Sequence, residues 1–178
     1  MNKGADGGHV RQALRAATMA NHQRVDALFA DFSLDAPDSY RAFLRAHARA
    51  LGALEDVARP DSPRLPLLGQ DLRALGESLP APLPLADGGE GFRWGVRYAL
   101  EGSRLGGAML SRQVGEGLPK AYLCAVHEKG GWAAFQAEMD VAAAQGDQDW
   151  MAQAVAGAQA AFALFGEAGA RERSGLHG

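Results

Sequence analysis

Residues 98–110 read Tyr-Ala-Leu-Glu-Gly-Ser-Arg-Leu-Gly-Gly-Ala-Met-Leu, and the interpretation of the whole chain starts from this stretch. Most of its residues favour a helix, yet each interior helical glycine costs roughly 1 kcal/mol relative to alanine. Gly102 and Gly106 are four residues apart and therefore share one helix face, with Gly107 beside them. Together they leave a strip of bare backbone. Either a flat ligand, over which the helix would kink, or a closely packed second helix fits such a strip, and the spacing leaves both readings open.

The chain as a whole is predicted to be a single all-α domain. It has 178 residues, of which 47% are hydrophobic and 22% are charged. A globular domain of this length buries about 70% of its unfolded surface, which is enough for a core. Alanine is abundant and no stretch alternates with period two, so we expect no strands. The net charge of −3 gives no electrostatic reason to expect binding to nucleic acid or to an acidic membrane.

Several common classes of site are not supported by the sequence. A single cysteine, Cys124, excludes an internal disulfide and does not make a zinc site. There is no phosphate loop, and neither Ser103 nor Ser111 has the context of a nucleophile elbow. No apolar run approaches the 18 residues of a membrane span, and residues 1–8 lack the apolar core of a signal peptide. We therefore expect a cytoplasmic protein.

The apolar spacing predicts the helices and the limits of the domain. We expect a flexible tail at residues 1–8, a helical domain over residues 9–170 and a polar tail at residues 171–178. The proline- and glycine-rich residues 80–89 are expected to form a surface loop within one domain. Helices are predicted over residues 9–30, 35–57, 67–79, 91 to 115 or 117, and 147–170. A further helix is predicted to open at residues 130–131, and a short helix or irregular arm over residues 118–129.

His22 is the histidine whose position makes it a candidate ligand. It lies on the shoulder of the apolar stripe of the first helix, in line with Val25 and Phe29. Arg15 lies two turns earlier on the same side. A histidine in such a position is more often a core or surface residue than a ligand, so the pattern alone supports both roles. His47 is flanked by apolar residues and is interpreted as a core residue.

Several segments together resemble the biliverdin-producing heme oxygenases. The run Leu14-Arg-Ala-Ala-Thr-Met-Ala-Asn-His-Gln-Arg-Val-Asp-Ala-Leu is similar to the first-helix motif of that family, whose histidine is the proximal iron ligand. The run Glu101-Gly-Ser-Arg-Leu-Gly-Gly-Ala is similar to the distal-helix motif, whose glycines lie over the heme. The resemblance extends over most of the chain, and three shorter segments also fit it: residues 40–44, 131–135 and 160–165.

The resemblance implies a heme oxygenase-like fold in which heme lies between a proximal helix and a kinked distal helix. The neutral imidazole of His22 would ligate the iron, which is a common role of histidine. On the distal side, dioxygen and ordered water would need the space that bare backbone leaves. The residues implied there are Gly102, Ser103, Gly106 and Gly107.

Three further residues are implied around the edge of the heme. Arg15 matches a position where a basic residue contacts a heme propionate in relatives. Lys129 is a candidate for the second propionate, with a solvated lysine as the alternative. Phe162 lies in the matching segment near the end of the chain and is the aromatic candidate for the heme pocket. Some family members have an acidic residue at the position of Ser103, whereas bacterial members often have serine.

The implied activity is oxidative cleavage of heme to biliverdin, with release of carbon monoxide and iron. It requires dioxygen and an electron donor, which can be a ferredoxin, a flavodoxin, a reductase or ascorbate. The reaction would serve either iron acquisition, through the released iron, or the supply of biliverdin as chromophore to a phytochrome. Two alternatives stand beside this one. The chain could hold heme or another tetrapyrrole without degrading it, or its glycines could serve helix packing alone.

Overall fold

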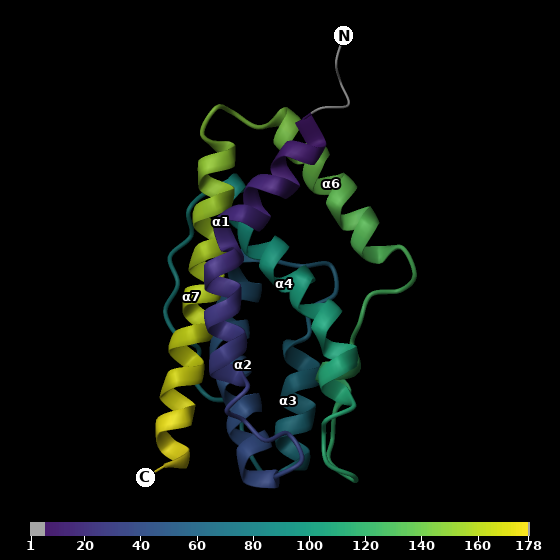
Figure 1. The fold of residues 1–178 in the computed structure, drawn as a ribbon, viewed down its shortest axis with the longest axis vertical. Helices are drawn as coiled ribbons and strands as arrows, with labels where there is room; N and C mark the ends of the chain where they lie inside the picture. Colours follow the sequence, from purple (N-terminus) through teal and green to yellow (C-terminus); the bar gives the residue numbers. More distant parts are fainter. Residues whose placement is uncertain (1–5, 178) are drawn as a thin grey trace.

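The computed structural model describes residues 6–177, and all regular structure in them is helical (Figure 1). This confirms the predicted all-α class. Within the same residues, no helix is long and apolar enough to cross a membrane. The helices are α1 (Asp6–Phe29), α2 (Pro37–Ala58), α3 (Leu65–Ala74), α4 (Glu90–Ser111), α5 (Ala121–Cys124), α6 (Gly131–Gln145) and α7 (Trp150–Leu176).

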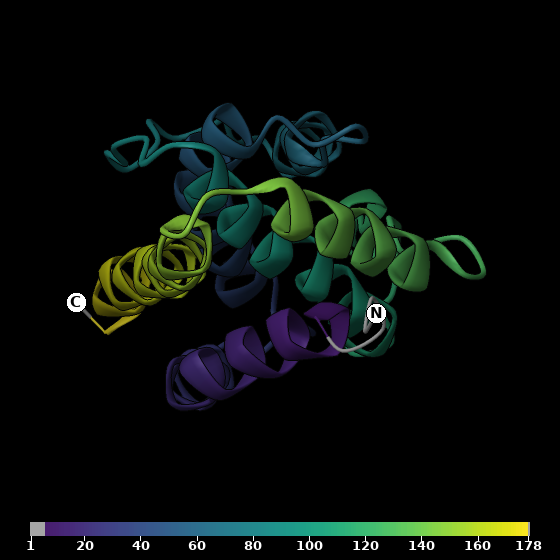
Figure 2. The ribbon, with the colours of Figure 1, turned by 90° about the horizontal axis from the view of Figure 1, so that it is seen from above.

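The longest helix, α7, is the element on which the others assemble. It contacts α1, α2 and α4 along its length. From above, α1 and α4 are separate helices that both extend from α7 towards α6 (Figure 2). Since α6 also contacts both α1 and α4, these two helices are held relative to each other by α7 and α6.

The contact between α4 and α7 is unusually close because two glycines form it. A Cβ atom on Gly95 would lie 1.9 Å from the carbonyl oxygen of Ala154. A Cβ atom on Gly157 would lie 2.0 Å from the carbonyl oxygen of Phe92. No side chain fits at these distances, so the two backbones touch here. This contact fixes the first half of α4 against the rest of the molecule.

The side chains of α2 form the centre of the larger hydrophobic core. Its apolar side chains are buried, and Pro37 occupies its first turn. A second core lies where α1, α6 and α7 meet, beside the aromatic side chains of α4. Large buried side chains of the two cores include Tyr40, Phe43, Leu44, Leu51 and Leu54 from α2, and Leu14, Phe135, Met139 and Trp150 from the other three helices.

The two ends of the domain differ from the sequence-based boundaries. Residues 1–5 of the expected N-terminal tail lie outside the described residues, and α1 begins at Asp6. The expected C-terminal tail is helical as far as Leu176. The reason is the buried Glu172 carboxylate, which accepts hydrogen bonds from Arg45 at 2.9 Å and Arg49 at 2.8 Å. These bonds tie the last turns of α7 to α2.

The connections agree in part with the prediction. Residues 80–89 contain the expected loop, and residues 118–129 contain only the single turn of α5. The helix predicted over residues 67–79 is the shorter α3. It ends before Gly76, where the chain turns through a left-handed conformation with φ of 78°.

Candidate functional site

The glycines of α4 serve different purposes. Within the described part of the chain, a Cβ atom on Gly106 would meet nothing within 4 Å, and one on Gly102 would meet only the tip of the Trp132 ring, at 3.8 Å. A Cβ atom on Gly107 would instead lie 2.6 Å from the carbonyl oxygen of Leu123 in α5. Helix packing therefore explains Gly107. The sequence spacing placed Gly107 in the open strip, but in the structure it lies against α5. Packing does not explain Gly102 or Gly106, and we call these two the glycine strip.

Large apolar side chains are exposed on the two helices that carry the predicted site. Leu105 and Met109 of α4 and Met19 of α1 are each more than half exposed. Helical spacing places Leu105 and Met109 on the same side of α4 as the glycine strip, and Met19 one turn before His22. Exposed apolar groups next to a bare backbone strip are typical of a binding surface for an apolar ligand.

The His22 side chain is 61% exposed, and two neighbours orient its ring. Nδ1 lies 3.4 Å from a carboxylate oxygen of Asp26, one helical turn later. The ring also meets Phe162 of α7 edge-on, with 5.6 Å between the ring centroids. A carboxylate at one imidazole nitrogen fixes the ring and raises the basicity of the other, which is a recurrent arrangement around metal-ligating histidines. The arrangement leaves Nε2 for a metal. Asp26 was not singled out in the sequence, although its spacing of four residues from His22 could have indicated it.

The charge of Arg15 in α1 acts on the hydroxyl of Tyr98 in α4. Burial raises the pKa of the Tyr98 hydroxyl, and the positive charge of the nearby Arg15 opposes this rise. Tyr98 lies one turn before Gly102 and also packs against Trp132. The Arg15 guanidinium and the Tyr98 hydroxyl are therefore candidates for binding an anion. Lys129 is exposed in the loop before α6, in agreement with the solvated alternative.

Ser103 is engaged on the inner side of α4. Its hydroxyl donates to the carbonyl oxygen of Leu100 at 2.6 Å and accepts a hydrogen bond from Arg64. The Arg64 guanidinium also donates to the Leu100 carbonyl at 3.0 Å and lies 5.2 Å from the centroid of the Tyr122 ring. Arg64 is only 4% exposed. Sequence reasoning missed it, because an arginine among prolines in a connecting segment has the pattern of a solvated residue.

A second buried polar group lies beside the first. The carboxylate of Glu101 pairs with Arg104 at 3.0 Å and lies 3.5 Å from Nε2 of His127. The same histidine nitrogen is 2.9 Å from the carbonyl oxygen of Glu101. Arg104 in turn donates to the carbonyl oxygens of Ser62 and Ala125. The connection between α2 and α3 and the segment after α5 are therefore tied to α4 next to the glycine strip.

His47 is a core residue, as its apolar neighbours predicted. Its ring packs among Phe29, Phe43 and Phe165, and Nδ1 is 2.7 Å from the hydroxyl of Tyr122. Burial in this apolar environment lowers the pKa of His47 to about 3. The imidazole is therefore neutral at physiological pH, and it is committed to Tyr122.

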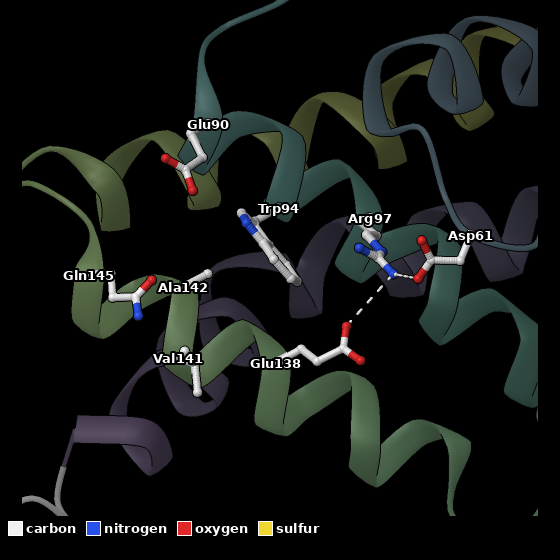
Figure 3. Close-up of a pocket in the computed structure, with 8 residues that line it drawn as sticks. All are labelled: Asp61, Glu90, Trp94, Arg97, Glu138, Val141, Ala142 and Gln145. Atoms are coloured by element: carbon white, nitrogen blue, oxygen red, sulfur yellow. Dashed lines mark hydrogen bonds and ion pairs between the residues drawn. The ribbon is translucent and has the colours of Figure 1, made fainter.

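A groove of about 510 Å³ lies between α4 and α6, on another face of α4 (Figure 3). Arg97 crosses it over the Trp94 ring and pairs with Asp61 at 2.7 Å. The carboxylates of Glu90 and Glu138 also line the groove. Three carboxylates against one guanidinium give a negative lining that would repel heme propionates, so we do not assign heme to this groove.

Comparison with known proteins identifies the family. No family model matches the chain. A curated protein of Xanthomonas campestris pv. campestris (strain 8004), named heme oxygenase, is 36% identical over 149 residues, which cover 72% of this chain and 87% of that protein. The chain belongs to the heme oxygenase family. It is therefore an oxidoreductase that degrades heme.

The fold agrees with this membership. The structure of the NO- and CO-bound heme oxygenase from Neisseria meningitidis matches this one with a TM-score of 0.79 at 24% identity. The match covers 92% of this chain and 91% of that chain. The predicted heme oxygenase-like fold is thereby confirmed.

Proposed function

We propose that this enzyme binds heme between α1 and α4 and cleaves it to biliverdin, carbon monoxide and iron. His22 is the proximal ligand in this proposal, and the glycine strip covers the distal side. The observation that supports it best is the space beside the strip. Among the described residues, none approaches a Cβ atom placed on Gly106 within 4 Å, whereas Gly95 in the same helix is in backbone contact.

On the proximal side, the chain presents one imidazole nitrogen, Nε2 of His22, to the iron. The Asp26 carboxylate lies 3.4 Å from Nδ1 of His22, so a proton is favoured on Nδ1 and the lone pair of Nε2 is left for the iron. The edge of Phe162 limits rotation of the imidazole. A neutral ligand is needed here, and an aspartate at this distance stabilises the required tautomer.

On the distal side, the chain contributes space and exclusion of bulk water. Bound heme supplies the iron and the ring at which dioxygen reacts. Gly102 and Gly106 present backbone where a side chain would fill the oxygen site. Leu105 and Met109 flank the strip with apolar surface against which the porphyrin packs. Ser103 acts through its bonds to Arg64 and the backbone.

At the heme edge, Arg15 and Tyr98 are the proposed propionate donors. Each gives an N–H or O–H from a different helix, and a charge-assisted hydrogen bond of this kind contributes about 1.5–3 kcal/mol when desolvated. Lys129 is the residue that the sequence suggested for the second propionate, and its effect on heme binding is to be compared with those of Arg15 and Tyr98.

Electrons come from an external donor, for which a ferredoxin, a flavodoxin, a reductase or ascorbate is a candidate. A biliverdin-accepting phytochrome is the candidate consumer of the product.

The test is a heme titration followed by reduction in air. The purified protein is expected to develop a Soret band on binding heme, and this band is expected to decay as a biliverdin band grows after a reductant is added. His22→Ala is expected to weaken heme binding, and added imidazole is expected to restore part of the ferric spectrum. A Soret band that persists in the parent protein would support the non-degrading alternative. An unchanged spectrum in His22→Ala would remove this residue from the site.

A further inference from the structure

We propose that Arg64 and His127 are positioning residues, which hold the two peptide units immediately before Gly102 and so set where the glycine strip lies over the substrate. The proposal rests on the proposed function, because it takes the strip to be the distal wall of the heme site. Neither side chain is proposed to touch heme. Both act through the backbone of α4.

Arg64 holds the first of these peptide units. Its Nη2 donates to the carbonyl oxygen of Leu100 at 3.0 Å, and the same nitrogen donates to the hydroxyl of Ser103. Stacking over Tyr122 and the hydrogen bond from its own N–H to Glu55, at 2.7 Å, fix the arginine from two directions. Arg64 is only 4% exposed, so its anchored guanidinium is held in one position.

His127 holds the second peptide unit. Nε2–H donates to the carbonyl oxygen of Glu101 at 2.9 Å, and the side chain is 13% exposed. This carbonyl belongs to the same peptide plane as the N–H of Gly102. Rotation of that plane would displace the first glycine of the strip. His127 comes from the loop before α6, so a different part of the chain from Arg64 holds this second plane.

The physical effect follows from the geometry of helix carbonyls. In a regular helix each carbonyl accepts one N–H from four residues later and has a second lone pair free. A side-chain donor at that lone pair tilts the carbonyl and bends the helix at that point. Leu100 and Glu101 are adjacent, and both receive such donors. The two donors together fix the course of α4 where it enters the strip.

The experiment uses two pairs of variants that separate loss of the donor from loss of volume. His127→Gln and Arg64→Lys keep an N–H donor, whereas His127→Leu and Arg64→Met remove it. Cyanide affinity of the ferric, heme-loaded protein reports the distal space directly, and it is measured beside kcat, KM for heme and melting temperature. Lys120→Met is the matched control, because Lys120 donates to a carbonyl of the same helix at Ser111, away from the strip.

The donor-removing variants are expected to bind heme as the parent does. Cyanide affinity and kcat are expected to change about fivefold, the effect of one hydrogen bond, while KM for heme stays near the parent value. The donor-keeping variants and Lys120→Met are expected to stay within about twofold of the parent, a difference smaller than one hydrogen bond gives.

Two results would overturn the proposal. The first is unchanged cyanide affinity and kcat in His127→Leu and Arg64→Met. The second is equal loss in His127→Gln and His127→Leu, which would indicate a role of volume alone. If Arg64→Met does not fold, the His127 pair decides by the same criteria. Failure of the parent protein to bind heme through His22 would instead contradict the proposed function, and the titration of His22→Ala detects that separately.

Discussion

At the scale of single residues, the candidate site depends on pairs that join α1 to its neighbours. His22 is oriented by Asp26 in the same helix and by Phe162 in α7. Arg15 lies near Tyr98 of α4. The local spacing indicated His22 and Arg15, because both follow from positions along one helix. It did not indicate Tyr98, because an approach between two helices is set by the fold.

Arg15 and Tyr98 are expected to fix the orientation of heme in its plane. Arg15→Ala and Tyr98→Phe should each lower heme affinity about tenfold, which corresponds to loss of about 1.4 kcal/mol. They should also change the ratio of biliverdin isomers, since the ring is then free to rotate. Heme titration and chromatography of the products measure both effects. Lys129→Ala is the comparison, and a larger effect there would exchange the roles of Lys129 and Arg15.

His47 makes stability depend on pH with a definite sign. Its pKa is about 3 in the folded chain and 6.5 for the ordinary histidine of an unfolded chain, so the unfolded state binds the extra proton between these values. This contribution to stability is complete above pH 6.5 and is lost as the pH falls, with a slope of up to about 1.4 kcal/mol per pH unit. Urea unfolding between pH 7 and pH 4 is expected to show a steeper loss in the parent than in His47→Gln.

The difference between the pH profiles of the parent and His47→Gln isolates the contribution of His47 from that of the buried acids. Burial raises the pKa of Glu55 and of Asp71, so the folded state holds their protons to higher pH and their contribution has the opposite sign. These two groups are present in both proteins and cancel in the difference. Parallel pH profiles for the parent and His47→Gln would contradict the assignment of a neutral His47.

At the scale of elements, α4 shows what sequence periodicity predicts and what it does not. Its start and its amphipathic pattern were predicted from spacing along the chain, whereas its end was expected near residue 115 or 117 and lies at Ser111. The distinction between Gly107, which packs on α5, and Gly106, which does not, depends on what lies opposite. Arg64 and His127 reach α4 from 39 and 26 residues away, and local pattern contains no information on such pairs.

Alanine substitutions within α4 test this distinction. Gly106→Ala is expected to leave the melting temperature unchanged or slightly higher, since alanine favours the helix by up to about 1 kcal/mol. Heme should still bind, and single-turnover degradation should fall because the methyl group enters the distal space. Gly107→Ala should lower stability by about 1–3 kcal/mol through overpacking against Leu123. A Gly106→Ala protein that melts early but degrades heme at the parent rate would contradict the distal assignment.

At the scale of the whole molecule, the length of α7 decides how the parts fit together. The sequence predicted the start of a last helix and an apolar face, but it did not predict that the helix continues to Leu176. Polar residues near a chain end have the pattern of a tail. The buried Glu172 changes this, because two arginines of α2 satisfy its carboxylate. Long-range ion pairing thus overrides local composition.

Removal of the Glu172 charge is expected to loosen α7 from α2. Glu172→Gln removes the counter-charge of the half-buried Arg49 and leaves Arg45 with Glu77 alone, so it should lower the free energy of unfolding by about 1–3 kcal/mol. Glu167→Gln, on an exposed turn of the same helix, should change it by less than about 0.5 kcal/mol. Urea denaturation measures both variants. Equal effects would show that Glu172 contributes only as a surface charge does.

The backbone contacts of α4 also have a mechanical consequence. The helix rests on α7 at Gly95 and on α5 at Gly107, and between these two supports the described residues leave the backbone at Gly106 untouched. Arg64 and His127 support the helix within this interval through the carbonyls of Leu100 and Glu101, so the turn at Gly106 and the exposed Leu105 is expected to bend most easily. Amide hydrogens of residues 103–106 are therefore expected to exchange faster than those of residues 95–99, and heme is expected to slow the exchange of residues 103–106 alone.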